Sequence, residues 1–123
     1  MPSRPLVSVV DDDESVRESL PDLLREVGFT VQAFSSAKEF LASPAVSQSR
    51  CLILDIAMPG MTGPELQNEL ARRGNVVPIV FITAYADEAR REELIELGAV
   101  DCLFKPFADT MLIEAVEAAV RRS

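Results

Sequence analysis

The chain has 123 residues, of which 48% are hydrophobic and 26% are charged, a composition that fits one globular domain and leaves no room for a second. Its net charge is −8 and its arginines occur as scattered pairs, which argues against direct binding of nucleic acid by this chain. The sequence contains no histidine, and this excludes histidine triads, histidine general bases, histidine metal ligands and an internal phosphohistidine.

The sequence also lacks the features of a membrane or secreted protein. No apolar run approaches the roughly 18 residues of a membrane span, and the first residues lack the apolar segment of a secretion signal. The two cysteines, Cys51 and Cys102, are too far apart for a C-x-x-C pair and lie in apolar segments, so we expect buried thiols. We therefore expect a cytoplasmic protein that does not contact a membrane.

The chain begins with a predicted strand and a predicted helix. The β-branched apolar run Leu6–Val10 predicts the strand, and apolar residues then recur at helical spacing until Gly28 supplies a stop. Pro21 lies inside this helical pattern and should bend the helix or weaken its first half. Asp13 and Glu14 fit the roles of helix cap and helix-dipole partner at its start.

The same two elements follow again, and a third strand comes after them. Phe29–Phe34 predicts a strand, and the capping box Ser36–Glu39 opens a short helix through Leu41. The stretch Pro44–Arg50 is predicted to be a polar connection. Cys51–Asp55 is apolar up to one terminal acid, which suits a strand buried on both faces of a parallel sheet.

The remaining segments continue the alternation to the end of the chain. Thr62 and Glu65 form another capping box, with Pro64 in the first turn of a helix that ends near Gly74. A strand, a helix, a strand and a last helix then follow, at residues 77–83, 87–97, 100–104 and from about 109 onward.

Five alternations of buried strand and amphipathic helix predict a flavodoxin-like α/β fold, with a doubly wound five-stranded parallel sheet in the order 2-1-3-4-5. Ligands of such folds bind outside the carboxyl ends of the strands, at the switch point between strands one and three. Five polar groups are expected to meet there: Asp11, Asp12, Asp55, Thr83 and Lys105.

These five groups suit phosphoryl chemistry. Three carboxylates cannot all stay ionised without a counter-charge, and Mg²⁺ prefers such oxygen ligands. Lys105 adds a fixed positive charge and Thr83 a hydroxyl, so that the site could clamp a phosphoryl group. Asp55 is the best candidate nucleophile, with Asp11 and Asp12 holding the metal. Each residue alone is weak evidence, because a lone acid at a strand end is usually a turn residue. The hypothesis depends on all five residues being expected at the same edge of the sheet.

Four motifs carry a resemblance to a known family. The stretches VVDDDESVRESL, LILDIAMPGMTGPEL, VPIVFITAY and GAVDCLFKPF resemble the receiver domain of bacterial two-component response regulators, in the right order and over essentially the whole chain. The sequence around MPGMTG and GAVDCLFKPF is most similar to the FixJ-like (NarL/FixJ) group, whose receivers precede a helix-turn-helix DNA-binding domain.

The resemblance implies a role for each site residue. Asp55 would be the phosphoacceptor, and Thr83 and Lys105 would contact the phosphoryl group. The Mg²⁺ ligands, for which Mn²⁺ could substitute, would be Asp11, Asp12, Asp55 and the backbone carbonyl of Ala57. The family also implies a cis peptide bond between Lys105 and Pro106.

The resemblance further implies partners and an output. A sensor histidine kinase would be the phosphodonor, because this chain has no histidine. Phosphorylation would alter the surface formed by the fourth predicted helix, the fifth strand and the last helix, and favour a homodimer there. The role is signalling, although the domain assists its own phosphorylation and dephosphorylation. We expect residues 1–123 to form one receiver domain and residues 121–123 to begin a linker to an effector domain that regulates transcription.

One position departs from the family pattern. Cys102 lies where the family usually has an aromatic side chain that turns inward with the threonine. We favour a small core residue over a redox-sensitive thiol at this position. The signal would then pass through Thr83 and the following loop, which carries Ala84 and Tyr85.

Two rival functions stay open at this point. Asp11-x-Asp13, a later threonine and a later lysine also resemble a haloacid-dehalogenase-type phosphatase, in which Asp11 would be the nucleophile. The continuation Glu14-Ser15 is unusual for that class, and the chain leaves no room for a cap. A degenerate receiver that only binds a partner is the second rival; the complete acidic set argues against it.

Overall fold

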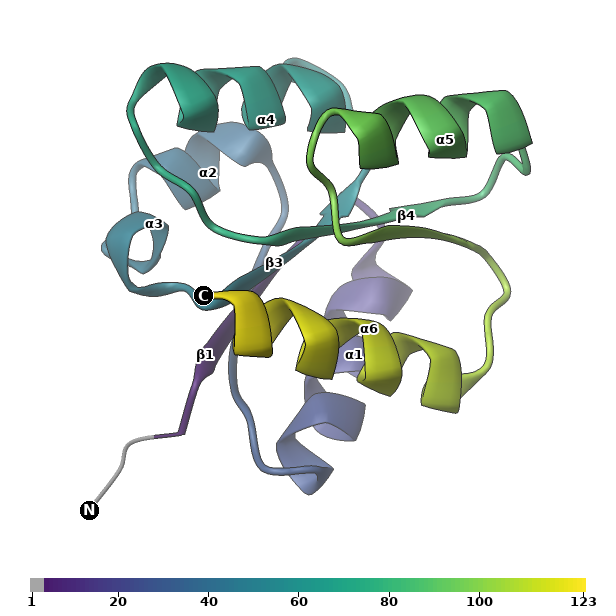
Figure 1. Cartoon of the computed structure of the whole chain (residues 1–123). Coiled ribbons are helices and arrows are strands. Elements are labelled where there is room, and N and C mark those ends of the chain that lie inside the picture. Colours follow the sequence, from purple (N-terminus) through teal and green to yellow (C-terminus); the bar gives the residue numbers. More distant parts are fainter. Residues whose placement is uncertain (1–3) are drawn as a thin grey trace.

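The computed structural model describes residues 4–123 and contains one five-stranded parallel sheet with helices on both faces (Figure 1). The strand order β2-β1-β3-β4-β5 and the flavodoxin-like fold confirm the prediction. The strands are β1 (Leu6–Val10), β2 (Thr30–Phe34), β3 (Cys51–Asp55), β4 (Ile79–Thr83) and β5 (Asp101–Phe104). The helices are α1 (Glu14–Glu26), α2 (Ala37–Leu41), α3 (Ala45–Gln48), α4 (Gly63–Arg72), α5 (Glu88–Glu96) and α6 (Asp109–Arg122).

The sheet separates two apolar layers. Helices α1 and α6 cover one face, and α2 to α5 cover the other (Figure 1). Every residue of β3 and β4 is buried, as expected for central strands of a sheet that is covered on both sides. The two strands therefore hold their carboxyl ends, and the residues that follow, in fixed positions.

The helix starts agree with the capping patterns, except that the box at Ser36 is half formed because the Glu39 carboxylate accepts from Ser35 instead of the Ser36 amide. Asp13 accepts hydrogen bonds from Ser15 at the start of α1, and Ser36 accepts from the Glu39 amide at the start of α2. Thr62 begins α4 with both halves of the capping box. Pro21 lies inside α1, which runs without interruption from Glu14 to Glu26.

The connection predicted between Pro44 and Arg50 is wrong in one respect, because it contains the one-turn helix α3. Ser43 Oγ accepts a hydrogen bond from the Ala45 amide, and the Ser49 amide donates to the Ala45 carbonyl. The Ala45 side chain is buried in the layer that α2 and α4 share. A single turn with one buried residue is too short to show helical periodicity in the sequence.

None of the helices in residues 4–123 is long and apolar enough to cross a membrane.

Candidate functional site

The carboxyl ends of the strands meet at one edge of the sheet. Asp11 directly follows β1, and its amide donates to the Phe34 carbonyl at the end of β2 over 3.1 Å. Lys105 directly follows β5, and its amide donates to the Thr83 carbonyl at the end of β4 over 2.7 Å. Asp55 is the last residue of β3. Strand pairing and the hydrogen bonds next to it therefore fix the backbone of Asp11, Asp55, Thr83 and Lys105.

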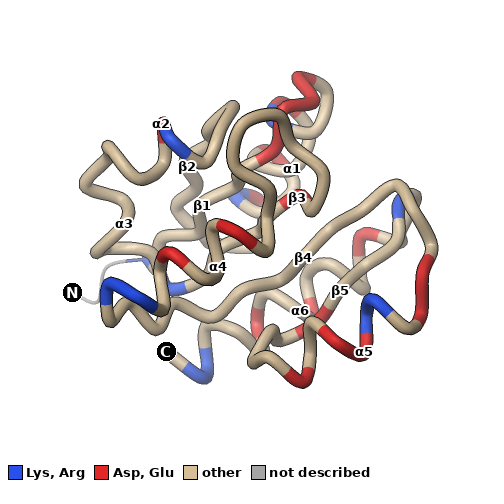
Figure 2. Tube along the Cα trace, turned by 90° about the horizontal axis from the view of Figure 1, so that it is seen from above, with Lys and Arg blue, Asp and Glu red and all other residues tan. Residues whose placement is uncertain are grey.

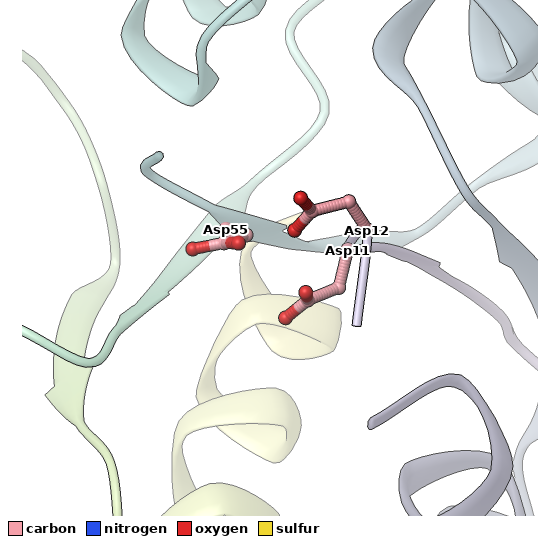
Figure 3. Close-up of side chains that lie close together, drawn as sticks. All are labelled: Asp11, Asp12 and Asp55. Carbon is pink, nitrogen blue, oxygen red and sulfur yellow. The ribbon is translucent and has the colours of Figure 1, made fainter. Parts of the chain in front are cut away.

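Three carboxylates point toward one another at this edge (Figure 3). One oxygen each from Asp11, Asp12 and Asp55 lies within 4.8 Å of the other two. Asp11 is completely buried, Asp55 is 7% exposed, and Asp12 faces solvent. Asp11 and Asp55 thus form the buried part of the cluster, and Asp12 forms its solvent-exposed part.

Asp11 is held at all three of its oxygen atoms. Its Oδ1 accepts from the Asp13 amide at 2.9 Å, and its Oδ2 accepts from Lys105 Nζ at 3.0 Å. Its backbone carbonyl accepts from Arg17 Nη1 at 3.0 Å. These contacts compensate the cost of burying a carboxylate and restrict its orientation. Asp11 is therefore a preorganised part of the site.

The environment of Asp55 favours its neutral form. Burial raises the pKa of the Asp55 carboxyl to about 7, and the nearby Asp11 charge acts in the same direction. Lys105 and a hydrogen bond from the Ala57 amide act in the opposite direction. A cation placed among the carboxylates would stabilise the ionised form, which is the form that can act as a nucleophile.

The carboxylates open into a cavity of about 220 Å³. It is lined by Asp11, Asp12, Asp13, Asp55, Ala57, Ala84, Tyr85 and Lys105. Tyr85, in the loop that follows β4, is 73% exposed, so this part of the lining is reached by solvent. A tetrahedral phosphoryl group and a hydrated cation are of a size that such a cavity could admit.

Thr83 is placed differently from the other predicted residues. It ends β4, is 4% exposed, and does not belong to the cavity lining. Its Oγ1 accepts a hydrogen bond from the Tyr85 amide at 3.1 Å. The hydroxyl is thus engaged by its own loop, and contact with a group in the cavity would change that loop.

The donor set fits a hard divalent cation. Asp11, Asp12 and Asp55 supply carboxylate oxygens, and Ala57 lines the same cavity. Mg²⁺ is bound by a few carboxylates and keeps several waters, which the exposure of Asp12 allows. The described residues offer no sulfur or imidazole ligand at this place, so the chemistry of the site favours Mg²⁺ or Mn²⁺ over zinc.

Two further predicted features lie in β5 and directly after it. The Lys105–Pro106 peptide bond is cis. Cys102 is 2% exposed and packs in the core, and burial raises the pKa of its thiol to about 11. Cys51 is also buried, with its pKa raised to about 12 for the same reason. Both cysteines are free thiols, as expected.

Sequence reasoning did not find two residues that shape the site. Arg17 reaches from α1 to the Asp11 carbonyl, and no sequence pattern marks a contact to backbone. Gly63 lies at the start of α4, where a Cβ atom would overlap the Asp55 carbonyl oxygen. The short spacing between the strand end and the capping box could have suggested such a close approach, since glycine allows it.

The chain is similar to known proteins over nearly its whole length. The family described as "Response regulator receiver domain" matches residues 7–117. Nodulation protein W of Bradyrhizobium diazoefficiens is 45% identical over 120 residues, which cover 98% of this chain and 53% of that protein. The transcriptional regulatory protein FixJ of Azorhizobium caulinodans is 41% identical over 123 residues, which cover 100% of this chain and 58% of that protein.

A solved structure shows the same relationship. The crystal structure of FixJ-N is similar with a TM-score of 0.87 and 39% identity, covering 99% of this chain and 98% of that one. The chain spans about half the length of the curated relatives it matches.

Proposed function

The chain belongs to the response regulator receiver domain family, and from this membership we propose that Asp55 accepts a phosphoryl group from a sensor histidine kinase. One observation carries the proposal: three carboxylates and one lysine from three different strand ends line a single open cavity. Such a set is expected for transfer of a charged group, because fixed opposite charges stabilise the charge that develops during transfer.

The chemistry is a displacement at phosphorus. A carboxylate oxygen of Asp55 would form a P–O bond while the P–N bond of a phosphohistidine breaks and the imidazole leaves. A Mg²⁺ ion held by Asp11, Asp12, Asp55 and the Ala57 carbonyl would offset the charge of the carboxylates and phosphoryl oxygens. Lys105 would leave Asp11 in part to bind a phosphoryl oxygen, and the Thr83 hydroxyl would bind another.

The output of the switch is proposed to be pairing through the surface formed by α5, β5 and α6. Exposed apolar side chains support this assignment: Tyr85 before α5, Leu97 at its end and Met111 on α6 are between 52% and 73% exposed. Transcription would then be controlled by a domain outside the 123 residues, as the names of the FixJ relatives suggest. A cytoplasmic location fits a partner kinase of this kind.

The decisive experiment is the intact mass of the chain after incubation with acetyl phosphate, with and without Mg²⁺. We expect a Mg²⁺-dependent gain of one phosphoryl group in the wild type and no gain in Asp55→Asn. A gain that survives Asp55→Asn but disappears in Asp11→Asn would place the nucleophile on the first strand, as in a phosphatase. No gain in any of these proteins would leave a binding module without phosphoacceptor activity.

A further inference from the structure

Helix α5 is held to the sheet differently from the other long helices. It buries a single side chain, Leu94, whereas α6 buries four residues and α1 and α4 bury three each. Apolar packing therefore contributes less to the position of α5 than to that of its neighbours. Polar contacts must supply more of what fixes this helix.

One side chain makes most of these polar contacts. The Arg91 guanidinium donates to the Asp101 carboxylate at 2.9 Å and to the Cys102 carbonyl at 3.1 Å, so that it joins α5 to β5. It also lies 3.8 Å from Glu88 within the helix. The planar fork of an arginine can satisfy two acceptors at once, which a lysine cannot do. We call the contacts of Arg91 with Asp101 and Cys102 the Arg91 clamp.

The clamp lies at an exposed edge of the sheet. Within residues 4–123 β5 pairs with β4 alone, and α5 runs beside it (Figure 2). The Arg91 and Asp101 side chains are 35% and 30% exposed, so water can replace their ion pair at modest cost, whereas Cys102 is 2% exposed. The clamp thus combines one ion pair that water can reach with one contact to the carbonyl of a buried residue.

The helix is also joined to the phosphoryl site. Four residues, Ala84 to Asp87, separate Thr83 from the first residue of α5, and Ala84 and Tyr85 line the site cavity. In this loop the Tyr85 amide donates to the Thr83 hydroxyl. If the Thr83 hydroxyl turns to bind a phosphoryl group, it loses its contact with the Tyr85 amide and the loop changes. A change of this loop would displace the start of α5, and the Arg91 clamp opposes that displacement.

We infer that Arg91 is a positioning residue, whose contacts with Asp101 and the Cys102 carbonyl hold α5 in the position in which the Tyr85 amide donates to Thr83, and so oppose phosphorylation of Asp55. This inference rests on the proposed function. A modification shifts the equilibrium between two positions of α5 only by the difference in its interaction free energy with them. The clamp stabilises one position, so phosphorylation must supply more free energy to reach the other. Loss of the clamp should therefore make the phosphorylation-competent arrangement more populated.

The opposite edge of the sheet supplies a matched control. Arg25 of α1 donates to the Val31 carbonyl of the edge strand β2 at 2.9 Å and lies 3.8 Å from Asp22. Arg25→Ala thus removes the same kind of helix-to-edge contact far from α5. Arg90→Ala removes a neighbouring arginine whose ion pair, with Glu93 at 3.7 Å, stays within the helix.

The first measurement is the initial rate of phosphorylation by acetyl phosphate at fixed Mg²⁺, followed by intact mass. We expect Arg91→Ala to be phosphorylated about three- to tenfold faster than wild type, the factor that corresponds to loss of one or two part-exposed contacts to a charged group. Arg91→Lys should lie between the two, and Arg25→Ala and Arg90→Ala should match wild type.

The second measurement needs no phosphorylation. Amide hydrogen exchange of residues 88–96 should rise in Arg91→Ala and stay at the wild-type level in Arg25→Ala. Phosphorylation of Arg91→Ala at the wild-type rate or more slowly, while the wild type is modified normally, would overturn this inference alone. Failure of the wild type to gain a phosphoryl group would overturn the proposed function and this inference with it.

Discussion

Lys105 Nζ lies 3.0 Å from Asp11 Oδ2, an ion pair between residues that are 94 positions apart in the chain. Asp11 is completely buried and the Lys105 side chain is 23% exposed. The pair therefore places a part-exposed cation against a buried anion, and both residues line the same cavity as Asp55. The charge of the same lysine also opposes the rise in the pKa of Asp55, so that Lys105 stabilises the ionised forms of two carboxylates.

The first prediction concerns this lysine. Lys105→Met would leave the buried Asp11 without its counter-charge, and we expect the free energy of unfolding to fall by about 2 kcal/mol, less than for a fully buried pair. Mg²⁺ should restore part of the loss, because a cation bound only by the folded chain stabilises it. Denaturant unfolding with and without Mg²⁺ measures both effects.

The matched control is the other lysine of the chain. Lys38 is exposed and makes no ion pair within residues 4–123, so Lys38→Met should change stability by less than about 0.5 kcal/mol. Equal losses in the two variants would contradict the importance of the Lys105–Asp11 pair.

The second prediction is a pH dependence of stability that originates at Asp55. The folded chain holds this pKa at about 7, above its ordinary value of 3.8, so folding takes up a proton between these two values. The contribution of Asp55 to stability is therefore full below pH 4, declines as the pH rises toward 7, and is absent above pH 7. Without divalent cations, Asp55→Asn should be more stable than wild type at pH 8 by roughly 1 to 3 kcal/mol.

Thermal unfolding of both proteins from pH 5 to pH 8 in the presence of a chelator tests this dependence. The difference between variant and wild type should grow across the range and shrink when Mg²⁺ is added at pH 8. A difference that stays constant with pH would show that Asp55 does not titrate in this window.

The third prediction concerns cation binding. Asp12→Asn removes one of three clustered carboxylates without disturbing the core, because Asp12 faces solvent. We expect Mg²⁺ to bind at least about tenfold more weakly. Tyr85 is the only tyrosine and lines the cavity, so its fluorescence is a natural reporter, with calorimetry as the second method. Glu18→Gln, an exposed acid on α1, should bind Mg²⁺ as the wild type does.

The fourth prediction concerns the close approach of α4 to β3. A Cβ atom at position 63 would overlap the Asp55 carbonyl oxygen, so Gly63→Ala should displace the end of β3 or the start of α4. We expect a loss of about 1 to 3 kcal/mol in unfolding free energy and slower phosphorylation by acetyl phosphate.

A second glycine separates these two effects. Gly98 has a φ of +110° and open space around it, so Gly98→Ala is strained only in its backbone. This variant should lose stability and keep its phosphorylation rate. If both glycine variants are phosphorylated equally fast, the contact between Gly63 and Asp55 does not matter for the site.

The fifth prediction concerns transmission of the signal. Cys102 is buried where the family usually has an aromatic side chain, whereas Tyr85 is exposed and its amide donates to Thr83. We expect Tyr85→Ala to accept a phosphoryl group within about threefold of the wild-type rate but to lose phosphorylation-dependent pairing, which sedimentation or light scattering would detect. Tyr85→Phe should behave as wild type; intact pairing in Tyr85→Ala would exclude this route.

Local sequence patterns determined most of the architecture. Capping boxes at Ser36 and Thr62 and the apolar runs Leu6–Val10 and Cys51–Asp55 predicted elements that the structure confirms, because caps and periodicity depend on residues only a few positions apart. The parallel order of the strands then required their carboxyl ends to meet, which brought Asp11, Asp55 and Lys105 to one edge before any contact was known.

Only the tertiary structure decided how these groups are arranged there. The pairing of Lys105 with Asp11, the overlap that reserves position 63 for glycine and the Arg91 clamp all join residues without a sequence relationship. The raised pKa of Asp55 likewise depends on burial and on a charge from another strand. Side-chain packing and long-range electrostatics act across the folded sheet, so the sequence alone predicted which strand-end residues would lie near one another, and the fold set their interactions.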